Sequence, residues 1–524
     1  MDIDQADLAA ASMRDPSGSA SRGHPGIRRY LDVPGPTGVP LLGNAHQIKP
    51  ESFHLRLEGW AKQFGPLFRF RIASRHFLGV SDPAVIASVL KQRPEVFLKG
   101  PRLVQVAKDL GFHGVFTANE DAWRRQRQLV LAGLDPAHLK TFLPQIVGVT
   151  ATLRDRWGRA AREGREIDVM ADLMRYTVDV TTCLAFGCNL NTLEKGDLDV
   201  IQQHLNVIFP TLSRRLLAPI DVERWLPRRG VRQHAEALSK AVGSFIRDAR
   251  HQLEQQPDLI LRPQNLLQAL VAACDSKGAT ITDKELSGNV LTMLLAGEDT
   301  TANSLGWLMW LLHAHPQEWA DAKAEVDRVV GEGAIPQSLE QLAQLDFLDA
   351  CANEAMRLKP VAPVNIVQAS KEVVVGGVSV PKGTFITCVM RPAGVDQGRF
   401  DEPEVFRPSR WMKGGQAEGG GMLSAKRVVM PFGAGPRVCP GRYLALAEIK
   451  MVMAMLLANF EIATMKTPEG GPKERLALTM SPAGLTMKLA SRPASSARRE
   501  PRLRKDDQAR QKTSAVGTVS PGLQ

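Results

Sequence analysis

The residue with the clearest chemical signature in this sequence is Cys439, which lies in the decapeptide Phe432-Gly-Ala-Gly-Pro-Arg-Val-Cys-Pro-Gly441. An apolar stretch with helical spacing follows it, so we expect the sulfur at a helix N-terminus. Unpaired N–H groups and the helix dipole favour a thiolate there, and Arg437 adds a fixed positive charge. Gly435 and Gly441 would supply positive φ or room for a flat cofactor. The pattern predicts a thiolate with a chemical role; a buried structural cysteine is the alternative.

A second polar cluster, Ala296-Gly-Glu-Asp-Thr-Thr301, interrupts the longest helical pattern of the chain. That pattern begins at Thr282-Asp-Lys-Glu285, which is a capping box, and Pro316 ends it. The Thr300 hydroxyl can donate to the carbonyl of Ala296 and open a local groove. Apolar residues on both sides place the helix in the interior, where an acid beside an alcohol suits proton delivery. A polar kink in an exposed helix is the alternative.

Two further motifs carry charge in helical spacing. Glu354 and Arg357 are three residues apart on one helix face, and alone such a pair is a surface ion pair worth a few tenths of a kcal/mol. Trp123 and Arg127 are four residues apart, and alone they indicate a basic amphipathic helix. Neither motif identifies a function by itself.

Together, these motifs resemble the cytochrome P450 family, in the family's order, from Asp32 to Leu489. The decapeptide resembles its haem-binding loop, Phe-x-x-Gly-x-Arg-x-Cys-x-Gly, which implies that Cys439 is the axial thiolate of haem b. Thiolate ligation favours cleavage of an O–O bond. The implied fold is mainly α with small β-sheets and a long central helix over the haem. The residues implied to bind haem are Trp123, Arg127, Ala296, Phe432, Arg437, Cys439 and Gly441.

The same resemblance implies roles for the other motifs. Asp299 and Thr300 correspond to the acid–alcohol pair that delivers protons to dioxygen. Glu354, Arg357 and Arg410 correspond to a structural ion-pair network that holds the cysteine loop. Many members also place an Arg or His where this chain has Gln368, to bind the second haem propionate. What binds that propionate here is left open.

Composition and charge divide the chain into three parts. A polar N-terminal extension covers residues 1–31, the catalytic domain covers 32–490, and a basic disordered tail is expected over 491–524. The tail holds eight Lys/Arg and three Asp/Glu, nearly half of the net charge of +11. Such charge invites a nucleic-acid interpretation, but no nucleic-acid motif accompanies it, so we expect no nucleic-acid partner.

The six cysteines are scattered without a CxxC pair, which favours reduced thiols and a cytoplasmic location. The first thirty residues contain no apolar stretch, so we expect neither a signal peptide nor a membrane anchor. The sequence also shows no Rossmann or flavodoxin-like series of strands and helices. We therefore expect no fused reductase, and electrons from a separate ferredoxin- or flavodoxin-type donor with its reductase.

We expect a soluble haem-thiolate monooxygenase that inserts one atom of O2 into a small hydrophobic organic substrate, in secondary metabolism. A peroxide-using or rearranging haem-thiolate enzyme is the alternative, which the intact Asp299–Thr300 pair disfavours. A haem sensor or a nucleic-acid-binding protein is a third class, for which the proton-delivery groove would have no purpose. The apolar residues expected around the substrate are Phe116, Phe209, Leu216, Val364, Ile366 and Leu485.

Overall fold

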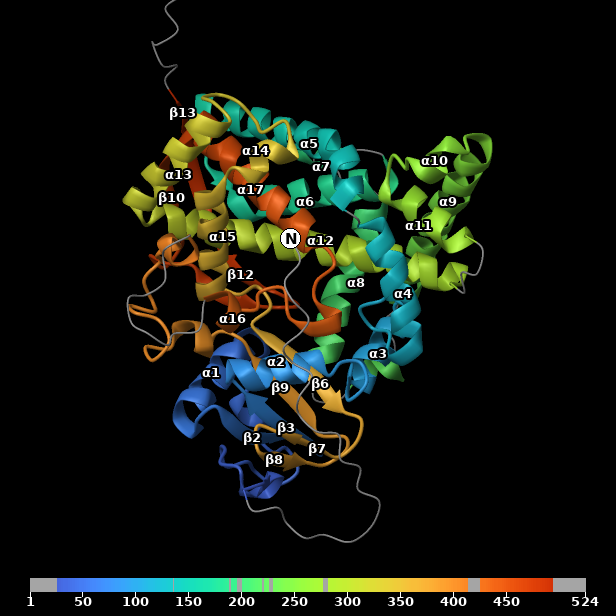
Figure 1. Ribbon diagram of the computed structural model, residues 1–524, viewed down its shortest axis with the longest axis vertical. Coiled ribbons are helices and arrows are strands. Elements are labelled where there is room, and N and C mark those ends of the chain that lie inside the picture. The colour runs from blue at the N-terminus through green and yellow to red at the C-terminus, as the bar shows by residue number, and fades with distance from the viewer. Residues whose placement is uncertain are drawn as a thin grey trace, which may run out of the picture.

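The computed structural model describes residues 26–134, 136–187, 190–195, 200–218, 221–225, 230–276, 281–412 and 425–492. Helices fill the upper and larger part of the molecule in Figure 1, and most strands lie in the lower part. The predicted fold class, mainly α with small β-sheets, is confirmed. Within the described residues, no helix combines the length and apolar character needed to cross a lipid bilayer.

Helices account for most of the secondary structure of the described chain. They are α1 (Phe53–Phe64), α2 (Pro83–Lys91), α3 (Pro101–Asp109), α4 (Glu120–Gly133), α5 (Pro136–Arg162), α6 (Val169–Phe186), α7 (Thr192–Lys195), α8 (Val200–Leu217), α9 (Val231–Gln255), α10 (Asp258–Leu261), α11 (Leu266–Asp275), α12 (Asp283–His313), α13 (Pro316–Val329), α14 (Leu339–Ala343), α15 (Asp346–Leu358), α16 (Ala425–Val428) and α17 (Arg442–Asn459). Short 3-10 turns are η1 (Tyr30–Asp32), η2 (Ala45–Gln47), η3 (Pro50–Ser52), η4 (Val222–Arg224), η5 (Pro392–Val395), η6 (Pro408–Trp411) and η7 (Gly435–Arg437).

The strands form small sheets rather than one large one. They are β1 (Arg28–Arg29), β2 (Leu67–Ile72), β3 (Arg75–Val80), β4 (Phe97–Leu98), β5 (Ile167–Asp168), β6 (Val364–Ala369), β7 (Val373–Val375), β8 (Val378–Val380), β9 (Phe385–Val389), β10 (Phe460–Lys466), β11 (Lys473–Leu476), β12 (Met480–Ala483) and β13 (Thr486–Ser491). The sheet orders are β2-β3-β9-β6-β4, β1-β8-β7, β10-β13-β5 and β11-β12.

The central helix α12 has the start that its sequence predicts. The Thr282 hydroxyl accepts from the Glu285 N–H at 3.2 Å, and the Glu285 carboxylate accepts from the Thr282 N–H at 3.0 Å. The helix then runs for 31 residues to His313 and is buried along most of its length. In Figure 1 it crosses the middle of the molecule beneath α6 and α17, with which it packs.

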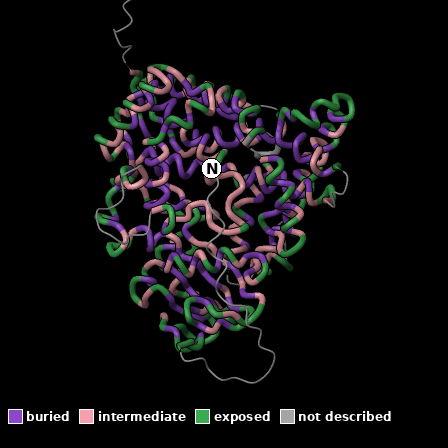
Figure 2. Tube along the Cα trace, in the orientation of Figure 1, coloured by how far each residue is buried: buried purple, intermediate pink, exposed green. Residues whose placement is uncertain are grey.

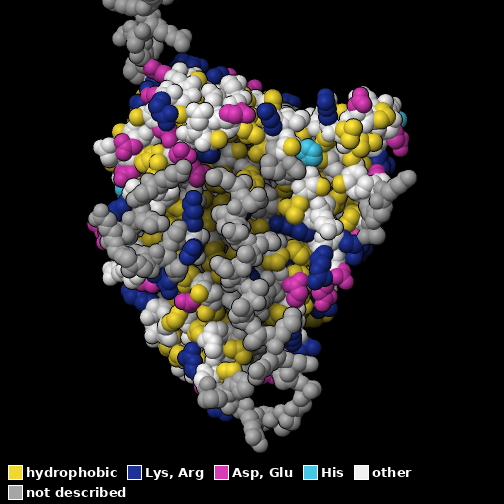
Figure 3. Space-filling view, viewed as in Figure 1, with side chains coloured by type: hydrophobic (Ala, Val, Ile, Leu, Met, Phe, Trp, Pro, Cys, Tyr) yellow, Lys and Arg dark blue, Asp and Glu magenta, His cyan; other side chains and the backbone are white. Residues whose placement is uncertain are grey.

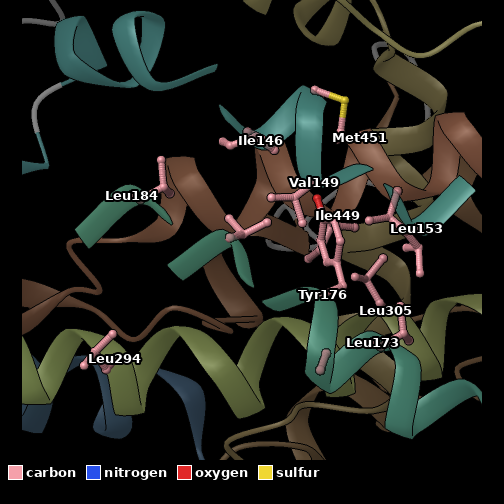
Figure 4. Close-up of a cluster of buried hydrophobic side chains, with 14 of the residues drawn as sticks. Ile146, Val149, Leu153, Leu173, Tyr176, Leu184, Leu294, Leu305, Ile449 and Met451 are labelled. Carbon is pink, nitrogen blue, oxygen red and sulfur yellow. The ribbon is translucent and has the colours of Figure 1, made fainter. Parts of the chain in front are cut away.

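The main hydrophobic core lies where α5, α6, α12 and α17 meet, in the helical part of the molecule. Figure 2 shows this interior as buried tube, with exposed residues on the outer turns. In Figure 4 the ring of Tyr176 lies among Val149, Leu153, Ile449 and other apolar side chains of this core. A smaller core fills the space between the five-stranded sheet and α2. A third cluster, in which Trp307 of α12 packs with residues of α1, β2 and β3, joins the helical part to the sheet part.

The boundaries of the domain differ slightly from those predicted. Tyr30, placed in the N-terminal extension, is only 6% exposed and donates its hydroxyl to the Phe77 carbonyl at 3.1 Å. Ser491 is the last residue of β13, and Arg492 pairs with Asp327 at 2.7 Å. The rest of the extension and of the tail, residues 1–25 and 493–524, lies outside the described residues. Among the described cysteines, Cys274, Cys351, Cys388 and Cys439 are free thiols.

One buried carboxyl group in the core has no charged partner among the described residues. Glu448 of α17 is 3% exposed, and its Oε2 has no hydrogen-bond partner in the described part of the chain. Burial raises the pKa of Glu448 from 4.5 to about 8. The folded protein therefore keeps this group protonated at neutral pH, whereas the unfolded chain ionises it.

This difference predicts a pH-dependent loss of stability. As pH rises from 5 to about 8, the unfolded state releases the Glu448 proton first, so the free energy of unfolding falls by several kcal/mol at most. Glu448→Gln cannot ionise. Its thermal midpoint relative to wild type should therefore rise from pH 5 to pH 8 and stay level above. Glu404→Gln, at an exposed site, is the matched control. A constant difference between Glu448→Gln and wild type across this pH range would contradict the assignment.

Candidate functional site

The cysteine loop leads from η7 into α17 and is closed by its own backbone. The Cys439 N–H donates to the Phe432 carbonyl at 2.9 Å. Gly435 has φ of +71°, and a Cβ there would lie 2.6 Å from the Leu90 carbonyl oxygen of α2. Glycine is therefore required for the loop to pack against α2. Among the described residues, such a Cβ at Gly441 would meet only the Cys439 sulfur, at 4.0 Å, so these protein atoms do not demand glycine there.

The surroundings of Cys439 act in both directions on its protonation. The sulfur lies near the start of α17, as predicted, because that helix begins at Arg442. Burial raises the pKa of the Cys439 thiol, and this effect exceeds the lowering by the Gly441 N–H and by Arg127. In the chain without a metal ion, desolvation therefore outweighs the helix end, and the thiolate stays a prediction for the haem-bound protein. A thiolate here requires a further positive charge at the sulfur, which a coordinated metal ion provides.

Helix α4 presents Trp123 and Arg127 to the cysteine loop. Arg127 Nη2 donates to the Val438 carbonyl at 2.7 Å. The Arg437 guanidinium lies 4.8 Å from the centroid of the Trp123 ring and donates to the Ala118 carbonyl at 2.5 Å. The structure thus brings Trp123, Arg127 and Arg437 together next to Cys439, as the sequence predicted.

The same helix also contacts α12. Gln126 Nε2 donates to the Glu285 carboxylate at 3.2 Å, and Asn289 Nδ2 donates to the Gln126 side-chain oxygen at 3.2 Å. Arg125 pairs with Glu285 at 3.3 Å. Helix α4 therefore fixes the position of the cysteine loop relative to the central helix, through bonds to both.

The turn of α12 around Thr300 has the predicted hydrogen bond. Thr300 Oγ1 donates to the Ala296 carbonyl at 2.7 Å. Ala296 is exposed although Leu295 and Glu298 beside it are buried, so this turn borders an opening instead of packed side chains. Burial raises the pKa of the half-buried Asp299. An acid with a raised pKa exchanges protons more readily near neutral pH, so the turn combines a proton carrier with an alcohol.

The apolar residues expected around a substrate fall into two groups. Five of the six are available to a ligand, because Phe116 is 44% exposed and the other four are half-buried, namely Phe209, Leu216, Val364 and Ile366. Leu485 is 1% exposed and belongs to the main hydrophobic core. Its prediction as a substrate contact is therefore wrong, because it is covered by other side chains.

Two cations that the sequence analysis missed lie near Arg437. Arg93 is only 3% exposed, and Lys99 Nζ lies 4.3 Å from the centroid of the Phe116 ring. Burial, and then the charges of Arg93 and Arg437, lower the pKa of Lys99 to about 7. Burial, Arg93 and Arg127 lower the pKa of Arg437 to about 10. No sequence motif marks Arg93 or Lys99, because only the fold brings them to the cysteine loop.

These cations form a cluster that lacks an anion, and we call Arg93, Lys99, Arg127 and Arg437 the cation cluster. Their hydrogen bonds go to carbonyl and amide oxygens, and in the described part of the chain none of them pairs with a carboxylate. Buried like charges are costly unless a ligand compensates them. Haem brings two propionate carboxylates and an iron that binds thiolate sulfur. The residues present therefore fit the haem that the sequence resemblance implies.

Gln368 takes no part in the cation cluster. Its side-chain amide donates to the Gly383 carbonyl at 2.8 Å, within its own sheet. Its partner across the β4–β6 pair is Leu98, the last residue of β4, so Lys99 follows directly after that strand. Lys99 therefore brings a cation to this region of the sheet, where Gln368 provides none.

The predicted structural ion-pair network is confirmed. Arg357 Nε and Nη2 each donate to the Glu354 carboxylate at 2.7 Å, and both side chains are fully buried. Arg410 Nε reaches the same carboxylate at 3.3 Å. The sequence analysis missed two further donors, Trp411 Nε1 and the Arg407 N–H, both at 2.9 Å. The buried carboxylate therefore ties α15 to the chain that leads toward the cysteine loop.

Loss of one positive charge from the cation cluster should have opposite effects on haem retention and on the stability of the haem-free protein. Lys99→Met should speed the transfer of haem from the holoprotein to excess apomyoglobin by about tenfold, because a charge-assisted contact is lost. It should also lower the reduction potential of the iron. The thermal midpoint of the haem-free protein should rise or stay unchanged, since one repelling charge is gone. Lys91→Met, at an exposed position, is the control. Unchanged haem transfer in Lys99→Met would show that this cation does not face the haem.

Comparison with known proteins agrees with this site. The family model described as Cytochrome P450 matches residues 33–489. Among curated relatives, cytochrome P450 97B2 (chloroplastic) of Glycine max is 27% identical, over 79% of this chain and 78% of that protein. Cytochrome P450 3A12 of Canis lupus familiaris is 26% identical, over 84% of this chain and 87% of its own. The self-sufficient monooxygenase CYP505U2 of Exserohilum turcicum is 26% identical, over 89% of this chain but 43% of its own length.

A solved structure shares the fold. The crystal structure of the cytochrome P450DA heme domain superposes with a TM-score of 0.77 at 24% identity, over 88% of this chain and 98% of that chain. The family model matches most of the chain, and the cysteine loop, the cation cluster and the central helix all lie within the matched residues. This chain belongs to the cytochrome P450 family of haem-thiolate monooxygenases.

Proposed function

We propose that this protein inserts one atom of O2 into a small hydrophobic organic substrate, with haem b as its cofactor and a separate ferredoxin- or flavodoxin-type electron donor. The observation that carries the proposal is the open turn of α12, where Thr300 bonds to the Ala296 carbonyl beside Asp299. Bound haem would supply the redox chemistry, and the chain would supply orientation and protons. A role in secondary metabolism and a cytoplasmic location stay predictions.

The geometry of the turn supports a proton-handling role for Thr300. A hydroxyl has one proton to donate, and here it goes to the Ala296 carbonyl, which leaves the oxygen lone pairs free to accept. Water in the opening beside Ala296 could then donate to this oxygen and pass a proton onward. The Asp299 carboxyl, with its raised pKa, would reload that water.

The test compares two threonines of the same helix. Thr300→Ala should keep substrate binding and NADH consumption with a reconstituted ferredoxin system, but divert most reducing equivalents to hydrogen peroxide. Asp299→Asn should instead slow the whole cycle. Thr292 also donates to a carbonyl four residues earlier, that of Gly288 at 2.7 Å, but it is buried. Thr292→Ala is therefore the matched control, with similar loss of stability and unchanged coupling.

Product formed per NADH decides the outcome, and Thr300→Ser should restore it. Equal coupling in Thr300→Ala and wild type would refute the proton-delivery role. Product formation from added peroxide, with no turnover from NADH and ferredoxin, would instead assign the protein to the peroxide-using enzymes. These two results are distinct, so each points to a different error in the proposal.

Five cations in segments near the cysteine loop are candidate contacts for an electron donor, namely Arg124, Arg125, Lys426, Arg427 and Arg442. Arg124 pairs with Glu95 at 2.9 Å and Arg125 pairs with Glu285. Arg442 lies over the Tyr443 ring, 4.6 Å from its centroid. The remaining two, Lys426 and Arg427 of α16, are exposed. Figure 3 shows Lys and Arg side chains intermixed with acidic ones on this face, so an acidic donor would depend on a few local cations.

Replacing these two cations should slow electron transfer. We expect Lys426→Gln with Arg427→Gln to lower the rate of reduction by an acidic ferredoxin severalfold at low salt, because charge steering raises the association rate. Arg124→Gln should have little effect, since its charge is already paired. High salt should remove the difference between the variants. A salt-independent rate in wild type would rule out this docking mode.

A further inference from the structure

Two histidines meet where helices α8 and α9 pack against each other. His204 Nδ1 of α8 lies 2.8 Å from His234 Nδ1 of α9, and the two rings meet edge-on with their centroids 5.0 Å apart. Both residues are half-buried, so the contact borders solvent. Neither residue belongs to the cysteine loop, the cation cluster or α12. We call these two residues the histidine pair, and the proposed reaction does not use them.

The surroundings of the histidine pair favour neutral imidazoles. Gly230, with φ of +91°, precedes α9, and its carbonyl accepts from the His234 N–H at 2.9 Å, so His234 lies in the first turn of that helix. The unpaired N–H groups of a helix start disfavour an imidazolium there. Burial, and then the charge of His234, lower the pKa of His204. A neutral imidazole has a free nitrogen lone pair, which is what a metal ion requires.

The charged residues that flank His234 in α9 compensate each other. Arg232 and Glu236 form an ion pair at 2.9 Å. Residues two positions apart on a helix do not face each other, so this ion pair lies on another face of α9 than the ring contact. Within the described residues, no third His, Cys, Asp or Glu joins the two rings in a group that could hold a metal ion. The histidine pair therefore offers two imidazole nitrogens to a ligand.

The separation of the two nitrogens is close to that of a metal site. Two neutral imidazoles in contact share one proton, so one Nδ1 donates and the other accepts. Two nitrogens that each bind Zn²⁺ at about 2.0 Å in tetrahedral geometry lie about 3.3 Å apart, so a side-chain movement of about 0.5 Å would admit the ion. Imidazole suits Zn²⁺, Ni²⁺ and Cu²⁺, whereas Mg²⁺ prefers oxygen ligands.

We propose that His204 and His234 together bind a divalent transition-metal ion of the Zn²⁺ type, which joins α8 to α9. Water would complete the coordination, because the pair borders solvent and supplies two ligands. Helix α8 also carries Phe209 and Leu216, two of the apolar residues expected around the substrate. A bound ion would therefore restrain a helix of the proposed substrate site. The metal site itself does not depend on the chemistry at Cys439.

Calorimetric titration of the holoprotein with ZnCl₂, in a buffer that does not chelate metals, tests the site. Wild type should bind one Zn²⁺ ion. His204→Gln and His234→Gln should each bind it at least about tenfold more weakly, because even the partner of a metal ligand is worth about 10- to 100-fold in affinity. Zn²⁺ should raise the thermal midpoint of wild type and of neither variant. Mg²⁺ should not compete with Zn²⁺.

His251→Gln is the matched control, because His251 lies at an exposed position of the same helix α9 and should leave Zn²⁺ binding unchanged. The haem absorption of each variant reports its folding, and a variant that fails to fold leaves the other member of the pair to decide. None of these measurements requires turnover, so they are independent of the proposed monooxygenase activity.

Three results would overturn the proposal. Equal Zn²⁺ affinity in wild type and in a folded variant of the pair would place the ion elsewhere. Equal weakening by His251→Gln would show that Zn²⁺ binds surface histidines without preference. A folded wild type that binds no Zn²⁺ would have a hydrogen-bonded histidine pair only.

Discussion

The constraint on which the proposed haem site depends is the repulsion among Arg93, Lys99, Arg127 and Arg437. Among the described residues, the hydrogen-bond acceptors of these arginines are carbonyl and amide oxygens, and none of the four cations pairs with a carboxylate. Burial and mutual repulsion depress the pKa of Lys99 and of Arg437, which is the electrostatic signature of a place prepared for an anion. Haem binding and folding are therefore linked, because the cofactor's carboxylates offset the electrostatic repulsion that destabilises the haem-free chain.

The rest of the architecture places that cluster against the central helix. Helix α4 bonds to Val438 in the cysteine loop and to Glu285 and Asn289 on α12, so one helix sets the distance between the two chemical elements. Close backbone approach also fixes the position of α12 relative to the segment between α3 and α4. A Cβ at Gly288 of α12 would lie 2.7 Å from the backbone of His113 in that segment. Rigid spacing of this kind allows a hydroxyl such as Thr300 to act on a reactant without reorganisation.

The sequence predicted the features that arise from short-range patterns. The capping box at Thr282, the Thr300 bond to the Ala296 carbonyl and the Glu354–Arg357 pair all lie within four residues, and all are present. The burial of Cys439, which raises the pKa of its thiol in the chain without a metal ion, was not predicted, because burial by distant segments has no local signature. Arg93 and Lys99 were missed for the same reason, and Leu485 was placed at the substrate although tertiary packing covers it.

The pairing of distant strands has a consequence for synthesis of the chain on the ribosome. Strand β1 pairs with β8, and β3 pairs with β9, so the N-terminal strands have no neighbour on those edges until the last third of the chain emerges. Cys439 emerges later still, after both sheets can close. Haem is therefore captured only after these strands have been able to pair, and the open edge of β3 needs protection from aggregation while translation proceeds.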